Sequence, residues 1–145
     1  MDNKLRNLVR IGQVSSINES KFTIKVKFND KDDMISDDIP YFSFEYNMPN
    51  IKDYVACIFL GNGLQSGFCL GKYYGEDNPP PVQDKDIFYK GFFGEAYLQY
   101  DKSTKTLTLS AQNIIIEGNL NVKGNIVATG SVTDTTGNTN HHSHP

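Results

Sequence analysis

Residues 22–28 read Phe-Thr-Ile-Lys-Val-Lys-Phe, and this stretch indicates the class of the fold. Apolar side chains at Phe22, Ile24, Val26 and Phe28 alternate with polar ones. Successive side chains of an extended strand point to opposite faces, so this alternation is typical of a strand with one buried face. The pattern predicts an all-β protein from its first regular element.

Similar signals lie on both sides of this strand. Ile11 and Val14 precede it with apolar side chains. Two apolar runs, 55–60 and 67–70, flank Gly61-Asn62-Gly63, where glycine and asparagine supply the positive φ that a tight turn requires. A series of short strands with this spacing is typical of a small barrel.

The segment Asn78-Pro79-Pro80-Pro81 interrupts the strand pattern. Consecutive prolines hold the chain extended and supply no hydrogen-bond donors to a sheet, so we expect a domain boundary here. Beyond it, residues 97–100 and 106–109 flank Asp101-Lys102-Ser103-Thr104, which predicts a second hairpin.

Three six-residue repeats occupy residues 117–134, each with glycine in its second position and an aliphatic residue in its fourth. One or two aliphatic side chains per repeat cannot offset the entropy lost on ordering six residues, so a single chain of this kind should not fold alone. Three chains wound about one axis would pair every strand edge and share an apolar core. The alternative is a flexible tail rich in Gly, Asn and Thr.

All three histidines lie in the last five residues, His141-His142-Ser143-His144-Pro145. Residues two apart in an extended chain share a face, so His142 and His144 are the candidate metal ligands. Two imidazoles leave a metal ion undersupplied, and a site therefore requires several chains. Four nitrogens from two chains suit tetrahedral zinc, six from three chains give an octahedron, and imidazole also suits iron, nickel and copper. The alternatives are a solvated polar terminus and a cloning tag.

Charge and hydropathy argue against several other functions. The formal net charge is −3, and the charged residues are spread without a basic block, so we expect no nucleic-acid partner. The longest apolar run, 54–60, is too short to span a bilayer. Cys57 and Cys69 lack metal-ligand spacing and are expected to be buried thiols.

No catalytic constellation is evident. The acidic residues lie mainly in loops such as 30–33 and 37–38, no histidine lies outside the last five residues, and no nucleophile motif is present. We therefore expect that the protein is not an enzyme.

The order of these features resembles that of the phage baseplate assembly protein V family, the central spikes of contractile tails and tail-like bacteriocins. No single motif carries the resemblance, which rests on their succession along nearly the whole chain. The matching segments are 10–14 and 55–60, then 71–74, the Asn78-Pro79-Pro80-Pro81 exit, 97–109, the glycine repeats and the histidine-rich end.

The resemblance implies an N-terminal OB-fold barrel followed by a trimeric intertwined β-helix spike with a metal-bound tip. In that family a His-x-His apex binds iron between three subunits, which we carry onto His142 and His144 only. One iron per trimer is then expected, with zinc or nickel as possible substitutes. The implied boundaries are 1–8 for an N-terminal lead, 9–78 for the OB-fold domain, 79–86 for a linker, 87–140 for the spike and 141–145 for the apex.

The implied function is a structural spike at the tip of a contractile-tail baseplate that pierces the envelope of the target cell. Its expected partners are two further copies of itself, the baseplate hub and tail tube proteins, and that envelope. Its expected location is the virion or tail-like particle, assembled in the bacterial host cytoplasm. Two binding functions compete with this interpretation: a receptor- or glycan-binding tail fibre module, and an OB-type domain that binds single-stranded nucleic acid or sugar.

Overall fold

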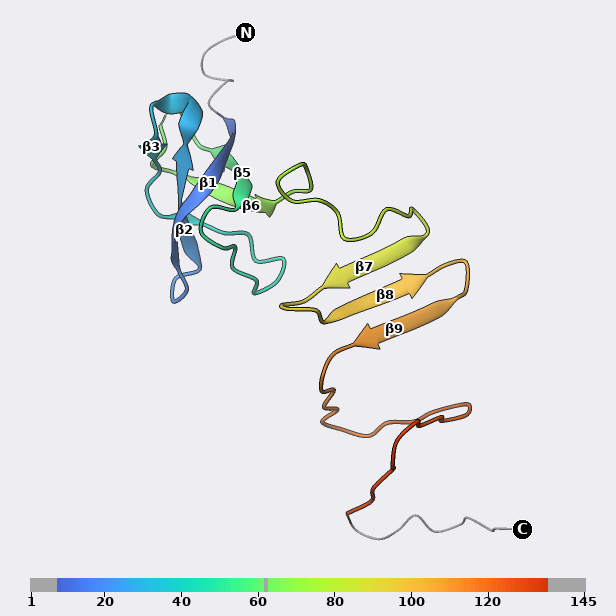
Figure 1. Cartoon of the computed structure of the whole chain (residues 1–145). Coiled ribbons are helices and arrows are strands. Elements are labelled where there is room, and N and C mark those ends of the chain that lie inside the picture. The colour runs from blue at the N-terminus through green and yellow to red at the C-terminus, as the bar shows by residue number, and fades with distance from the viewer. Residues whose placement is uncertain (1–7, 62, 136–145) are drawn as a thin grey trace, which may run out of the picture. The chain divides into compact units, whose positions relative to one another are not determined.

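The computed structural model describes residues 8–61 and 63–135 (Figure 1). These residues form two compact units that divide between Lys85 and Asp86, called here the N-terminal and C-terminal units. Strands and one short 3-10 helix are the regular elements of the described residues, so the prediction of an all-β protein is confirmed. Among these residues, no helix has the length and apolar character needed to cross a membrane.

The N-terminal unit contains the strands β1 to β6 and the 3-10 helix, and the C-terminal unit contains β7 to β9. The bounds are β1 (Val9–Asn18), β2 (Thr23–Phe28), the 3-10 helix η1 (Asn29–Lys31), β3 (Met34–Ile35), β4 (Ile39–Pro40), β5 (Tyr54–Phe59), β6 (Gly67–Lys72), β7 (Ile87–Gly91), β8 (Tyr97–Asp101) and β9 (Thr106–Ser110).

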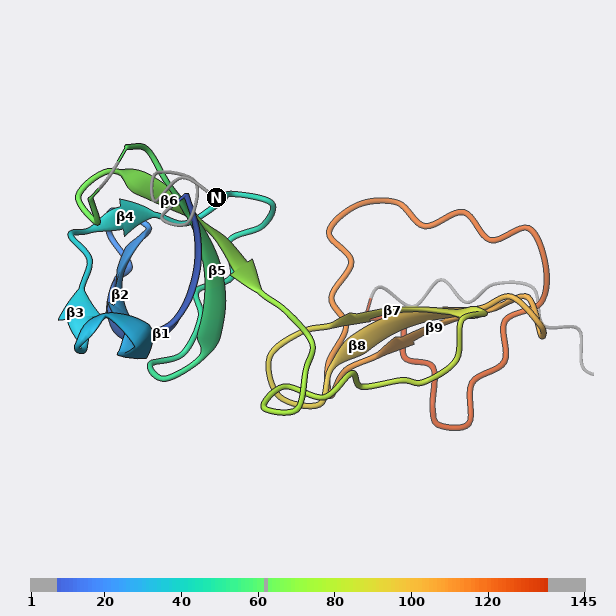
Figure 2. The ribbon, with the colours of Figure 1, turned by 90° about the horizontal axis from the view of Figure 1, so that it is seen from above.

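The strands of the N-terminal unit pair in a closed ring. The antiparallel path runs β3-β2-β1-β5-β6, and β4 also pairs with β2. Directly after β4, Tyr41 forms a parallel bridge with Cys69 of β6, and the Phe42 amide donates a 3.0 Å hydrogen bond to the Cys69 carbonyl oxygen. Pairing therefore follows the ring β1-β2-β4-β6-β5. Figure 2 shows these five strands around a common interior.

The interior of this ring is a hydrophobic core. On β2, Ile24, Val26 and Phe28 are buried, which confirms the buried face predicted from the alternation of residues 22–28. The Phe28 and Phe59 rings meet edge to face with centroids 5.6 Å apart. The complete set of buried apolar residues is Val14, Ile24, Val26, Phe28, Ile39, Val55, Cys57, Phe59 and Cys69.

The two cysteines lie in this core. Cys57 of β5 pairs directly with Cys69 of β6, so the predicted 55–60 and 67–70 hairpin is confirmed. Both are free thiols with no exposed surface, as expected. The hydrogen bond that Cys57 shares with Cys69, together with burial, raises the pKa of the Cys57 thiol.

Tyr41 fits against β6 because Gly71 leaves room for its ring. Gly71 has a positive φ of +124°, and a Cβ at this position would lie 3.1 Å from the Tyr41 hydroxyl oxygen. Burial, followed by the nearby Cys69, raises the pKa of the Tyr41 hydroxyl to about 12. A side chain at residue 71 would therefore press on the contact that links β4 to β6.

The C-terminal unit is a simple antiparallel meander. Strand β8 lies between β7 and β9, and the predicted hairpin around residues 101–104 is confirmed as β8 and β9. Residues 111–135 contain no strand. The intertwined β-helix therefore stays a prediction.

Gly12 provides a test of core packing in the N-terminal unit. An added Cβ would lie 2.6 Å from both the Lys27 carbonyl oxygen and Val26 Cγ1, so Gly12→Ala should lower the free energy of unfolding by about 1–3 kcal/mol. Gly63→Ala is the control, because its Cβ would meet nothing closer than 3.9 Å, and it should change stability by less than about 0.5 kcal/mol. Urea unfolding followed by near-UV circular dichroism measures both. Equal transition midpoints would contradict the packing described here.

Candidate functional site

The sheet of the C-terminal unit has one apolar face. Cross-strand register places side chains in rows on this face, since opposed residues of paired strands project to the same side. One row is Phe88, Tyr100 and Leu107, and the next is Lys90, Leu98 and Leu109. These six residues, of which Lys90 alone is charged, are called the apolar face below.

None of the described residues covers the apolar face. Phe88 is 62% exposed, Leu107 64% and Leu109 48%. None of the described residues between 86 and 135 is buried. Fully burying one such side chain is worth about 1.5–3 kcal/mol, so this face offers a large stabilisation that the single chain does not use.

The opposite face of the sheet is mostly polar. It carries Gln99, Thr106, Thr108 and Ser110 in the alternate strand positions. Its one aromatic feature is a stack of Tyr89 and Tyr97, whose ring centroids are 5.4 Å apart. The sheet is therefore amphipathic, with a solvent-compatible side and a side that requires a cover.

Asp101 fixes the turn that sets the register of the apolar face. Its Oδ1 accepts hydrogen bonds from the Ser103 hydroxyl at 2.6 Å, the Ser103 amide at 2.8 Å and the Thr104 amide at 3.3 Å. Lys105 then adopts a positive φ of 55°. The hydrogen bond from the Ser103 side chain, followed by those from the backbone, lowers the pKa of the Asp101 carboxyl.

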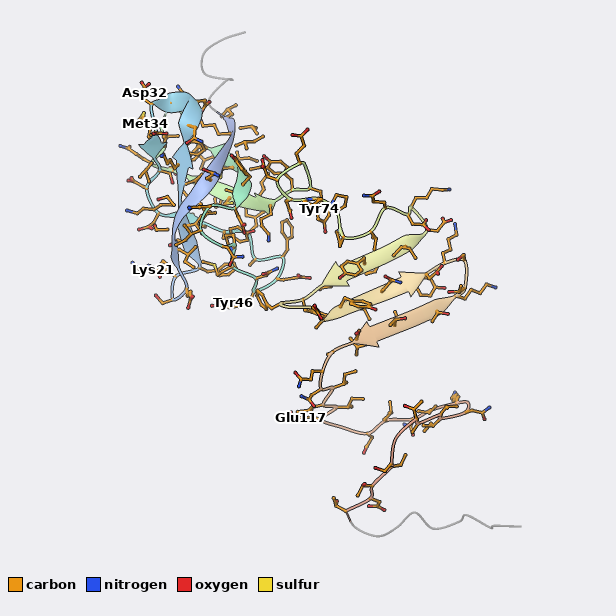
Figure 3. The ribbon with its side chains drawn as sticks, in the orientation of Figure 1. Lys21, Asp32, Met34, Tyr46, Tyr74 and Glu117 are labelled. Carbon is orange, nitrogen blue, oxygen red and sulfur yellow. The ribbon has the colours of Figure 1, made fainter. Side chains whose placement is uncertain are left out.

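Exposed aliphatic residues continue beyond the sheet. Gly118 and Gly124, the first two repeat glycines, have positive φ values of +147° and +157°, which favour glycine. Nothing lies within 4 Å of a Cβ built on either. Figure 3 shows side chains along this part of the chain, where Glu117 is labelled, without a sheet around them. The most exposed aliphatic residues are Ile115, Leu120, Ile126, Val127 and Val132.

The predicted metal ligands lie elsewhere. His142 and His144 are outside the described residues, so their site stays a prediction. In the part of the chain that is described, no group of three or more His, Cys, Asp or Glu side chains could hold a metal ion. The apolar face was missed by sequence reasoning. Ile87, Phe88 and Tyr89 are residue types that favour strands, but only the register shows which side chains share a face.

Comparison with known proteins finds a similarity to a phage protein. The chain is 28% identical over 81 residues to the spike protein of Escherichia phage P2. The matched segment is 56% of this chain and spans 37% of the phage protein. No family model matches the chain. The similarity, together with the all-β fold, supports a phage spike-type protein that is a component of the virion or tail.

The turn at Asp101 should resist mild acid. Because its folded-state pKa lies below the ordinary 3.8, the stability contributed by the charged carboxylate is complete above that value. It is lost as pH falls through the lowered pKa. Asp101→Ala removes the acceptor and should speed amide hydrogen exchange at Ser103 and Thr104 by on the order of tenfold at neutral pH.

Asp101→Asn is the matched control, because it keeps the side-chain oxygen and loses only the charge. It should speed exchange less than Asp101→Ala does, as measured by NMR. Equal exchange rates in all three proteins would mean that the carboxylate does not hold the turn.

Proposed function

We propose that this protein is the central spike at the tip of a contractile-tail baseplate, in a phage or a tail-like bacteriocin. In this proposal three chains assemble through residues 87–140 into an intertwined β-helix that pierces the envelope of the target cell. The similarity to a phage spike protein supports the class of the proposal. The matched segment spans 37% of that protein, so the assembly of the whole spike belongs to the proposal.

The observation that carries the proposal is the uncovered apolar face. A three-stranded sheet with no buried residue has little to offset the entropy of ordering its strands. Three copies related by a three-fold axis would turn three apolar faces toward one another and make a shared core. The exposed aliphatic residues of the repeats, such as Leu120, Ile126 and Val132, would extend that core along the same axis.

The N-terminal unit is proposed to be an OB-fold barrel that docks on the baseplate hub and tail tube proteins. The ring order β1-β2-β4-β6-β5, closed by a parallel contact, supports this assignment, since the OB fold is a five-stranded Greek-key barrel. Its role would be attachment. The protein is proposed to act mechanically and not as an enzyme, with stiffness from closed strand pairing as its contribution.

The tip is proposed to hold one iron ion through His142 and His144 of three chains, with zinc or nickel as possible substitutes. Six imidazole nitrogens around a three-fold axis supply an octahedral set. Such an ion would tie together three chain ends that otherwise fray.

Native mass spectrometry of the untagged protein, with metal analysis of the same sample, tests copy number and tip chemistry together. Three chains with one iron are expected. A monomer would refute the shared core, and a trimer without metal would refute the histidine site alone.

Leu109 and Thr108 provide a matched pair for the apolar face, because they are adjacent on β9 and project to opposite sides of the sheet. Leu109→Glu would place three carboxylates in the shared core and should weaken trimer formation by at least about a hundredfold in the association constant. Thr108→Glu adds the same charge to the polar face and should leave the trimer intact. Analytical ultracentrifugation of both variants decides this. Equal effects would show that the apolar face is not the interface.

Iron binding should depend on pH and on two of the three histidines. Imidazole binds metal in its neutral form, so occupancy should be full at pH 8 and fall below about pH 6 as protons compete. His142→Ala or His144→Ala should abolish binding at pH 8, whereas His141→Ala should not. Metal content after dialysis measures this. A flat profile from pH 8 to 5, or loss on His141→Ala, would contradict the assignment.

A further inference from the structure

A second apolar surface lies on the outside of the N-terminal unit. Register aligns Val9 of β1, Ile58 of β5 and Phe68 of β6 in one cross-strand row, and places Ile11 beside Ala56 in the next. Outward positions on β1 should be polar in an isolated barrel, yet Val9 is 63% exposed and Ile11 55%.

Aromatic rings extend this surface past the edge of β6. The Phe42 ring lies 5.7 Å from the Phe68 ring and 5.6 Å from the Phe44 ring, between centroids. Phe44 is 79% exposed. The surface formed by Val9, Ile11, Ile58, Phe68, Phe42 and Phe44 is called the outer strip.

The chemistry of the outer strip selects the kind of partner. Its six side chains are hydrocarbon only, with no charge and no hydrogen-bonding group. A glycan or a nucleic acid needs polar groups or positive charge for recognition, so neither fits this surface. An apolar protein surface does fit, because contiguous exposed apolar patches are typical of protein interfaces.

The size of the outer strip indicates that its partner is already held nearby. From the exposed fractions, the strip presents on the order of 500 Å². A stable complex of two free proteins buries about 800 Å² on each partner, so the strip alone is too small for one. It is large enough for a contact between domains that are tethered together.

The proposed trimer supplies such a tether. Residues 73–86 connect β6 to β7, and 14 residues span at most about 50 Å, so three N-terminal units on one spike stay close together. Short tethers give effective concentrations near the millimolar range, at which even a contact with a Kd of about 1 mM is half formed.

We propose that the outer strip is a contact between copies of this chain, in which three N-terminal units meet at the three-fold axis with their outer strips facing inward. This inference rests on the proposed trimer and adds a second contact between its chains, formed by the N-terminal units. The two contacts use different residues, so they can be tested separately.

The test is photo-crosslinking of the full-length chain with p-benzoylphenylalanine in place of Phe44. Irradiation should join chains covalently, with crosslinks that map to the outer strip of another chain. The matched control carries the same group in place of Lys21, an exposed residue of the β1–β2 turn that is labelled in Figure 3. The yield from position 44 should exceed that from position 21 by on the order of tenfold.

A second substitution tests the apolar character of the contact. Ile11→Lys, added to the protein with the photo-crosslinker at position 44, should reduce the yield to that of the control while native mass spectrometry still finds three chains. Val9→Lys is the replacement if circular dichroism shows that Ile11→Lys does not fold. Both positions are exposed, so a lysine side chain can extend into solvent from either.

The outcomes separate this inference from the proposed function. A trimer without crosslinks from position 44, or with crosslinks only within one chain or to a C-terminal unit, overturns the contact and leaves the spike. A monomer overturns both. A trimer whose crosslinks map between outer strips and disappear with Ile11→Lys establishes the contact.

Discussion

The structure depends on one constraint: an amphipathic sheet needs something to cover its apolar face. In the C-terminal unit, the rows Phe88-Tyr100-Leu107 and Lys90-Leu98-Leu109 share one side of three short strands, and no other described part of the chain buries them. Three strands of five residues give few backbone hydrogen bonds, and the entropy of ordering them is large. The proposed trimer would supply the missing contacts from identical copies of the same sheet.

The N-terminal unit meets the same constraint alone. Its sheet returns on itself through Tyr41 and Cys69, and this single parallel bridge lets β1, β2, β4, β5 and β6 share one interior. Every alternate residue of β2 and β5 can then be buried, because the opposite side of the ring provides the cover. The ring of strands can close at this point because Gly71 has no side chain and leaves room for the Tyr41 ring. The chain therefore joins a unit with a buried core to a unit whose described residues have none.

Local patterns in the sequence predicted the local structure. The alternation of residues 22–28 and the two hairpins could be predicted because strand period and turn residues are properties of adjacent positions. The Tyr41 bridge could not, since it joins residues 28 positions apart and follows two very short strands, β3 and β4. The apolar face could not be predicted either, because the register of three strands determines which side chains share it. His142 and His144 remain predictions from spacing and resemblance, beyond the described residues.

In the proposed assembly, the apolar face and the histidine pair both depend on the number of chains. Two imidazoles per chain make a poor site, and six make an octahedral one, so the proposed metal would bind strongly only where three chain ends are already together. Trimer formation along residues 87–140 would bring those ends together, and metal binding would in turn stabilise the trimer by mass action. The coupling is reciprocal, so a chain whose apolar face is disrupted should lose metal affinity even with both histidines intact. The proposed tip is therefore a property of the assembly and not of the sequence that carries it.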